Sequence, residues 1–327
     1  MTRITIKLTA IACLLLCVSA CTQVAISENA RTRDRGLRRA TSGDSSARSS
    51  DTYGRPTRLG LLGYKEINES SGIVSSRTNP GLYWTHNDSG DGPFVYAIDA
   101  KGTHKGVWRV TGATARDWED IAIGPGPERG TNYLYIGDTG DNRGARAEIR
   151  IYRVAEPKIT SGDANSTKVA PVATKDAEII RLRYPNGAND AETLLIHPQS
   201  GNVYIVTKVP LGNPVVYEAK APLNTRETTT LVRVGEVSLP VLFGGLITGG
   251  DISPDGLRVA LCDYQQGYEL ELPAAGAGFN AVWKQTVTVV ELGERKQGEA
   301  IGYRLDGRAL LATSEGRRAP LIQVVRR

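Results

Sequence analysis

From Arg58 to the C-terminus, apolar and aromatic residues come in short runs of four to seven, separated by Gly, Pro, Asn and Asp. Short runs rich in β-branched and aromatic residues and bounded by turn formers are typical of β-strands. No stretch keeps a 3.6-residue apolar period over a dozen residues, as an amphipathic helix would. The pattern therefore predicts an all-β domain over residues 58–327.

The predicted strands fall into five similar units, each with a first strand, a second and a third, and usually a fourth before the next unit. The units open with the segments 70–74, 118–123, 191–196, 250–256 and 298–303. A four-stranded antiparallel sheet repeated about every fifty residues is typical of a β-propeller blade. We therefore expect a five-bladed β-propeller. A six-bladed ring is one alternative, because the segment between Glu119 and Glu192 has room for extra strands, and a sandwich or solenoid is another.

The last unit ends with its third strand, so the final blade lacks an outer strand. The apolar run 59–64, which precedes the first unit, can supply it. Joining the two ends of the chain in one blade closes the ring and removes an exposed sheet edge. We expect this closure.

The first twenty residues have the pattern of a lipoprotein signal peptide. Arg3 and Lys7 are followed by the apolar run 8–18, and Val-Ser-Ala then precedes Cys21. The run is too short to span a bilayer, which indicates a processing signal. We expect cleavage after residue 20 and lipidation of Cys21, which would make the protein an extracytoplasmic, membrane-anchored lipoprotein of a bacterial cell envelope. Plain secretion with cleavage nearby is the alternative.

Positive charge is concentrated between the expected anchor and the β domain. Residues 22–57 hold seven Arg against four acidic residues and are rich in Ser, Thr and Gly, whereas 58–327 holds 31 basic and 31 acidic residues. A segment of this composition buries too little apolar area to order itself. We therefore expect a disordered basic tether over 21–57, attracted to an anionic membrane surface. Nucleic-acid binding is not expected.

Cysteine usage excludes an intramolecular disulfide in the mature chain. Cys13 and Cys17 leave with the signal peptide, and lipidation uses Cys21. Cys262, which lies in an apolar run, remains as a single thiol. We expect it to be a buried, unreactive side chain of the core.

One position near the start of the first strand is polar in every unit. It holds Ser71, Glu119, Glu192, Asp251 and Glu299. First strands line the central channel of a propeller, so these carboxylates would converge, repel one another and favour a neutralising cation. Calcium is the expected ion because it takes six to eight oxygen ligands in irregular geometry. The alternative is that each acid caps a turn or pairs with a nearby base.

Two polar loops follow the second strand of the first two units. One contains His86, Asn87 and Asp88, and the other contains Asp138, Asp141, Asn142 and Arg143. In adjacent blades, these loops would flank one channel mouth. Asp88, Asp138 and Asp141 could then hold a metal or position a water molecule, and His86, Asn87, Asn142 and Arg143 could contact a ligand. The alternative is that Asp and Asn only form turns here.

Four segments carry a resemblance to secreted bacterial propeller proteins: 69–73, 84–90, 117–122 and 135–142. A more distant likeness is to calcium-activated nucleotidases (apyrases), which are five-bladed propellers with a calcium ion in the central channel. Ser71, Glu119, Glu192 and Glu299 look like that family's calcium ligands, whereas Asp251 stands where the family usually has Ser. The Asn87-Asp88 loop is similar to an acidic loop near the family's nucleotide site. The family's phosphate-gripping basic residues have no clear counterparts in this sequence.

Two functions are compatible with these patterns. The first is a tethered propeller, expected to be monomeric, that binds an extracytoplasmic ligand or protein at one channel mouth and holds a structural calcium ion. The second is a metal-dependent phosphoesterase or esterase that uses the loops of Asp88, Asp138 and Asp141. The sequence contains no G-x-S-x-G elbow, H-E-x-x-H motif or P-loop.

Overall fold

The computed structural model describes residues 48–49, 52–240, 245–274 and 276–327. These residues belong to one compact unit, Ser45–Arg327. The predicted signal peptide and Cys21 lie outside the described residues. No helix in the described ranges is long and apolar enough to cross a membrane.

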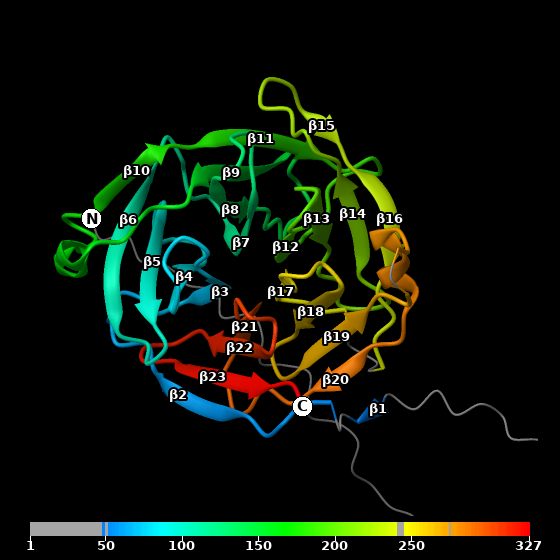
Figure 1. The fold of residues 1–327 in the computed structure, drawn as a ribbon. Helices are drawn as coiled ribbons and strands as arrows, with labels where there is room; N and C mark the ends of the chain where they lie inside the picture. The colour runs from blue at the N-terminus through cyan, green and yellow to red at the C-terminus, as the bar shows by residue number, and fades with distance from the viewer. Residues whose placement is uncertain (1–47, 50–51, 241–244, 275) are drawn as a thin grey trace, which may run out of the picture. The chain divides into compact units, whose positions relative to one another are not determined.

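Five antiparallel sheets form a ring of blades, as Figure 1 shows. Blade 1 contains β3 (Ser70–Ser75), β4 (Leu82–Asn87), β5 (Phe94–Asp99) and β6 (His104–Thr111). Blade 2 contains β7 (Trp118–Pro125), β8 (Asn132–Asp138), β9 (Ile149–Ala155) and β11 (Glu178–Arg183). Blade 3 contains β12 (Thr193–Ile196), β13 (Val203–Val206), β14 (Val215–Ala219) and β16 (Val232–Glu236). Blade 4 contains β17 (Gly249–Ile252), β18 (Arg258–Cys262), β19 (Gly267–Glu271) and β20 (Thr288–Val290). Blade 5 contains β21 (Gly298–Tyr303), β22 (Ala309–Ser314), β23 (Pro320–Val325) and β2 (Thr57–Leu61).

The first strands of successive blades, β3, β7, β12, β17 and β21, contact one another in turn, and β21 contacts β3 again. The prediction of a five-bladed propeller is therefore confirmed. The long segment between Glu119 and Glu192 adds no sixth blade. It contains the 3₁₀ helix η1 (Ser161–Asn165) and a short strand, β10 (Val172–Asp176), that pairs with blade 1.

Three short strands strap neighbouring blades together by parallel pairing. β10 leads into β11 of blade 2 and pairs with β6 of blade 1. In the same way β15 (Thr229–Thr230) leads into blade 3 and pairs with β11 of blade 2. β1 (Arg48–Ser49) precedes β2 of blade 5 and pairs with β20 of blade 4. Each strap covers the outer edge of the preceding blade, which leaves fewer unpaired backbone groups exposed.

The N-terminal strand closes the ring as expected, since β2 pairs antiparallel with β23. Residues before β2 also belong to the propeller. Tyr53 is 4% exposed and forms a β-bridge with Arg326, and its hydroxyl donates to Glu269 Oε1 at 2.5 Å. The structured domain thus begins before residue 58, the boundary that composition suggested. Tyr53 anchors this segment through its hydrogen bond to the buried Glu269. The average composition of a basic, Ser-rich segment does not reveal one such residue.

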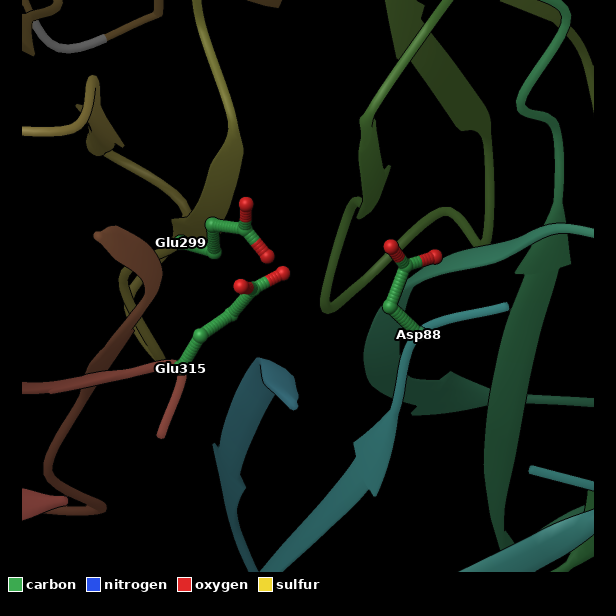
Figure 2. A group of neighbouring side chains, drawn as sticks. All are labelled: Asp88, Glu299 and Glu315. Atoms are coloured by element: carbon green, nitrogen blue, oxygen red, sulfur yellow. The ribbon is translucent and has the colours of Figure 1, made fainter. Parts of the chain in front are cut away.

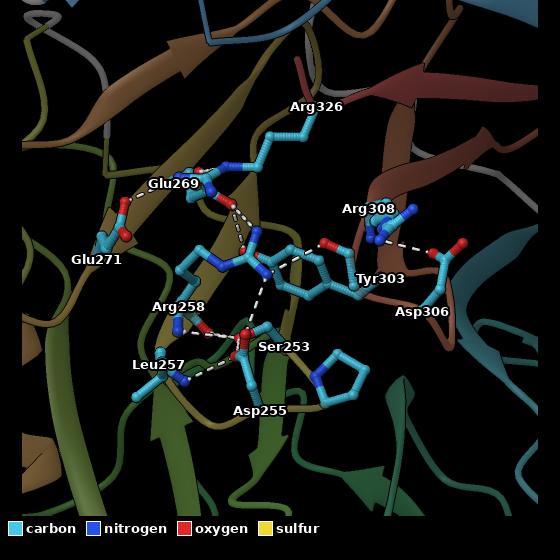
Figure 3. A network of polar contacts seen from close by, with 12 residues as sticks. Ser253, Asp255, Leu257, Arg258, Glu269, Glu271, Tyr303, Asp306, Arg308 and Arg326 are labelled. Carbon is cyan, nitrogen blue, oxygen red and sulfur yellow. Dashed lines mark hydrogen bonds and ion pairs between the residues drawn. The ribbon is translucent and has the colours of Figure 1, made fainter. Parts of the chain in front are cut away.

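Glu269 is the centre of this closure. Tyr303 of β21 also donates to its Oε1, at 2.7 Å, and Arg258 and Arg326 each approach the carboxylate to 3.6 Å (Figure 3). The carboxylate is 3% exposed. It therefore joins blade 4, blade 5 and the N-terminal segment through groups that compensate its buried charge.

The hydrophobic core consists of five clusters, each of which spans one pair of adjacent blades. Between blades 1 and 2, for example, Trp84 and Trp108 pack edge to face near Trp118. Cys262 lies between blades 4 and 5, with no exposed surface. The expectation of a buried cysteine is therefore confirmed, and burial raises the pKa of its thiol to about 12, which disfavours the reactive thiolate.

Candidate functional site

Three of the five first strands carry a β-bulge at the polar position identified from the sequence. The register with the second strand shifts between Ser70 and Gly72, between Trp118 and Asp120, and between Gly298 and Ala300. The extra residues are Ser71, Glu119 and Glu299. β12 and β17 pair with their second strands without a shift. Because a bulge re-aims a side chain, these three blades present that position differently from blades 3 and 4.

Five carboxylates from three blades gather at the end of the ring where the first strands begin. The oxygen atoms of Asp88, Glu299 and Glu315 lie within 4.8 Å of one another, as do those of Asp88, Asp117 and Glu119. Figure 2 shows Glu299 and Glu315 pointing toward each other, with Asp88 opposite them. We call these five residues the acidic mouth.

The two glutamates on bulges are the most buried members of the acidic mouth. Glu119 is 4% exposed and Glu299 is 5% exposed. Burial, with Glu192 and Asp88 close by, raises the pKa of Glu119 well above its usual value. Burial and the adjacent Glu315 likewise raise the pKa of Glu299, and burial raises that of Asp88 to about 6. Bringing these groups together thus opposes their ionisation, and a bound cation would reverse that effect.

The donors of the acidic mouth are all carboxylate oxygens. Oxygen ligands suit hard cations, of which calcium tolerates the widest range of ligand numbers and angles. Zinc and other transition metals favour imidazole or thiolate ligands, and the acidic mouth contains neither. The residues therefore fit a calcium-type ion chemically.

Glu192 lies near this group but already has a positively charged partner. The ammonium group of Lys208 donates to Glu192 and, at 2.7 Å, to the hydroxyl oxygen of Tyr264. Burial raises the pKa of Glu192 to about 7, while Lys208 acts in the opposite direction. Glu192 belongs to neither three-residue group of the acidic mouth.

Ser71 and Asp251 also lie outside the two groups. The Ser71 hydroxyl donates to the backbone oxygen of Glu119 at 2.6 Å. Asp251, at the third position of β17, accepts hydrogen bonds from the amides of Ile252 and Tyr303, both at 2.8 Å. Asp120 acts similarly and accepts from the amide of Leu194 at 3.0 Å. These contacts fasten neighbouring first strands together, as the capping alternative expected of the aligned acids.

The three aspartates predicted to act together make different contacts. Asp88 belongs to the acidic mouth. Asp138 forms a buried ion pair with Arg146 at 2.8 Å, and both side chains are at most 3% exposed. Asp141 accepts hydrogen bonds from the amides of Ala145 and Arg146, at 3.0 and 2.8 Å. Asp138 and Asp141 therefore stabilise the conformation of the loop 138–146.

Of the other residues predicted to contact a ligand, His86 and Asn87 make buried structural contacts, whereas Asn142 and Arg143 are exposed. His86 is fully buried, its Nδ1 lies 2.8 Å from the backbone oxygen of Asn87, and burial lowers its pKa to about 4. Asn87 accepts hydrogen bonds from the amides of Asn68 and Glu69, both at 3.1 Å. Asn142 and Arg143 are exposed at the surface of the loop.

Sequence reasoning missed Asp117 and Glu315. Glu315 directly follows β22, as Asp88 directly follows β4, so the two residues occupy equivalent places after the second strand of their blades. Aligning the units on that position, as well as on the first strand, would have found Glu315. Asp117 directly precedes β7 and lies two residues before Glu119.

A scan against protein-family models and a search of curated proteins each give no match. Among solved structures, the chain is similar to one from a crystal structure of a nidogen/laminin complex. The match has a TM-score of 0.42 and 13% sequence identity, and it covers 76% of this chain and 72% of the other. No functional conclusion follows from a similarity at this level.

Proposed function

We propose that this protein is a tethered binding propeller that holds a divalent cation, calcium in the first instance, in the acidic mouth and binds its ligand there. The observation that carries the proposal is the gathering of five carboxylates from three blades around Asp88. Two of them, Glu119 and Glu299, are placed by β-bulges and are almost completely buried.

The electrostatic balance of the acidic mouth supports a cation. Within the described residues, none of its five carboxylates forms an ion pair with a Lys or Arg side chain. Glu192, Asp138 and Glu269 are buried to a similar extent as Glu119 and Glu299, and each of the three has such a partner. Ionised carboxylates in buried positions need a compensating charge, which here a metal ion would supply.

The hydrolase alternative depended on Asp88, Asp138 and Asp141 acting as one group. Because Asp138 and Asp141 make contacts that shape their own loop, no specific observation favours that reaction over binding. The proposed tether depends on Cys21, which lies outside the described residues and remains a prediction from the sequence.

Calcium titration of the purified full chain tests the proposal. Calcium at about one hundred times its dissociation constant should add about 2.7 kcal/mol to the free energy of unfolding, which raises the melting temperature by roughly 5 °C. Calorimetric melting in EDTA and in calcium measures this shift. Asp88→Asn and Glu299→Gln should abolish it, because each removes one charged ligand.

Glu227→Gln is the matched control, since it removes an exposed carboxylate outside the acidic mouth and should keep the full shift. Identical melting curves of the wild type in EDTA and in calcium, after complete removal of metal, would show that the acidic mouth is not a calcium site. A shift that both site variants retain would place the ion elsewhere.

A further inference from the structure

A cavity of about 390 Å³ adjoins the acidic mouth on blade 5. One wall comes from the segment that links β20 to β21, and the other from the turn between β22 and β23. The lining residues are Glu294, Arg295, Lys296, Ser314, Glu315, Gly316, Arg317, Arg318, Ala319 and Pro320. Glu315 belongs to both places, since it lines the cavity and its carboxylate lies within 4.8 Å of those of Asp88 and Glu299.

Four basic side chains line this cavity: Arg295, Lys296, Arg317 and Arg318. In the described part of the chain, none of the four forms an ion pair. This contrasts with the basic residues around Glu269, which all have carboxylate partners. The lining also contains the carboxylates of Glu294 and Glu315, so its four basic side chains exceed its two acidic ones, and an excess of positive charge attracts an anion.

Arg295 has an unusual position in the wall. Its Nη2 lies 3.4 Å from the backbone oxygen of Asp263, and its Nε and Nη1 have no hydrogen-bond acceptor among the described residues. A Cβ at residue 298 would lie 2.2 Å from Nη1, so Gly298 allows the guanidinium group to pack against the start of β21. The guanidinium group is therefore held against the start of β21, and Arg295 forms no ion pair with the described residues.

The turn that carries Arg317 and Arg318 is also strained. Arg318 has a φ of 55°, the single positive φ among non-glycine residues in the described ranges. A side chain in this region costs free energy, and such residues occur preferentially at binding sites. The strained turn keeps Arg317 and Arg318 on the cavity side of blade 5.

We infer that this cavity binds an oxyanion, the carboxylate or phosphate of a small ligand, together with the cation of the acidic mouth. The inference rests on the proposed function, because the cation is part of the site. The cavity volume of about 390 Å³ is at the lower end of the range of small-molecule sites, which fits a ligand about the size of a monosaccharide.

Anion and cation should bind cooperatively for an electrostatic reason. Glu315, with Glu299 and Asp88 behind it, repels an anion that enters the cavity when no metal is present. A divalent ion between these carboxylates removes the repulsion and attracts the anion from the same side. Binding of either ion should then tighten binding of the other by the same factor, typically about 5-fold to 150-fold for coupled sites.

Isothermal titration of the full chain with three sugars tests the inference. Glucose 6-phosphate and glucuronate present a phosphate and a carboxylate on similar frames, and glucose is the neutral control. In 1 mM calcium, which is about a physiological extracellular level, we expect saturable binding of at least one of the two anions and none of glucose. In EDTA, the affinity for the anion should fall at least about fivefold.

Two variants locate the anion. Arg318→Asn removes one positive charge while tolerating the positive φ, and it should weaken anion binding at least about fivefold without weakening calcium binding. Arg129→Gln removes an exposed positive charge from the turn between β7 and β8, at the opposite end of the ring, and should change neither.

Calcium binding with no saturable binding of either anion would overturn the inference and leave the proposed function standing. Equal anion affinity in calcium and EDTA, or unchanged affinity in Arg318→Asn, would overturn it too. The absence of calcium binding would instead remove the proposed function, and with it the coupled site.

Discussion

Asp88 and Asp138 stand at the ends of the second strands of neighbouring blades, in loops of similar composition. Their surroundings give them opposite roles. Asp138 accepts a hydrogen bond from the buried guanidinium group of Arg146, whereas Asp88 faces four other carboxylates. The same residue type thus stabilises one loop and, in the other, adds repulsion that a cation would relieve.

The Asp138→Asn substitution tests this difference. It leaves the charge of Arg146 buried without a partner, so the free energy of unfolding should fall by about 3 kcal/mol. Chemical denaturation of the wild type and the variant measures the loss, while the calcium-induced shift in melting temperature should persist.

Replacing both members of the pair, as in Asp138→Asn with Arg146→Met, should recover part of the stability, because no unpaired charge remains. Native stability together with lost calcium binding in Asp138→Asn would mean that Asp138 belongs to the metal site after all.

At the scale of strands, the most informative elements are the bulges in β3, β7 and β21. A one-residue shift changes which side chain enters the channel, and nothing in the local sequence marks it. Alignment on the first strand grouped Ser71, Glu119 and Glu299, which are the three bulged residues, without revealing the bulges themselves. It also included Asp251, whose carboxylate binds the amides of neighbouring strands at the third position of β17.

The straps show a second limit of sequence reasoning. Alternation of apolar and polar residues reveals the four strands of a blade, because these pack against a core. β1, β10 and β15 pair only at an outer edge, and the described residues of β10 are mostly exposed or half-buried. Because it buries so little surface, a strap has no hydrophobic pattern. The number of blades could therefore be predicted from the sequence, but the straps could not.

The hydrogen bond from Tyr53 in the N-terminal segment to Glu269 gives a test at this scale. Tyr53→Phe removes a hydrogen bond to a buried, charged acceptor, which should lower the free energy of unfolding by about 2 kcal/mol. Denaturation of the purified variant measures it. Tyr184→Phe is the control, because the Tyr184 hydroxyl is buried but has no partner among the described residues, and it should have little effect. Equal effects of the two substitutions would show that the hydrogen bond from Tyr53 to Glu269 contributes nothing to the free energy of unfolding.

At the scale of the molecule, the chain enters the propeller at the end of the ring opposite the acidic mouth. Thr57, the first residue of β2, pairs with Gln323 near the end of β23, whereas the mouth lies where β21 begins and β22 ends. β2 therefore begins at the end of the ring away from the acidic mouth and runs toward it.

The anchor itself is tested by Cys21→Ser. If Cys21 carries the lipid, the variant should take up no labelled palmitate and should be absent from the membrane fraction of the producing cells, because a single apolar signal run cannot hold it there. Labelling at wild-type levels would assign the lipid to another residue. Cys262 is not a competing site, since its thiol is fully buried.

The pairing of β2 with β23 also sets an order of events during synthesis. β2 is the first blade strand to leave the ribosome, and its partner β23 is the last, so the contact spans nearly the whole domain. Contacts between residues so far apart in the chain form slowly. A product that stops before β23 leaves β2 and the outer edge of β22 unpaired, and exposed edges of this kind promote aggregation or proteolysis. Ring closure therefore distinguishes finished molecules from truncated ones.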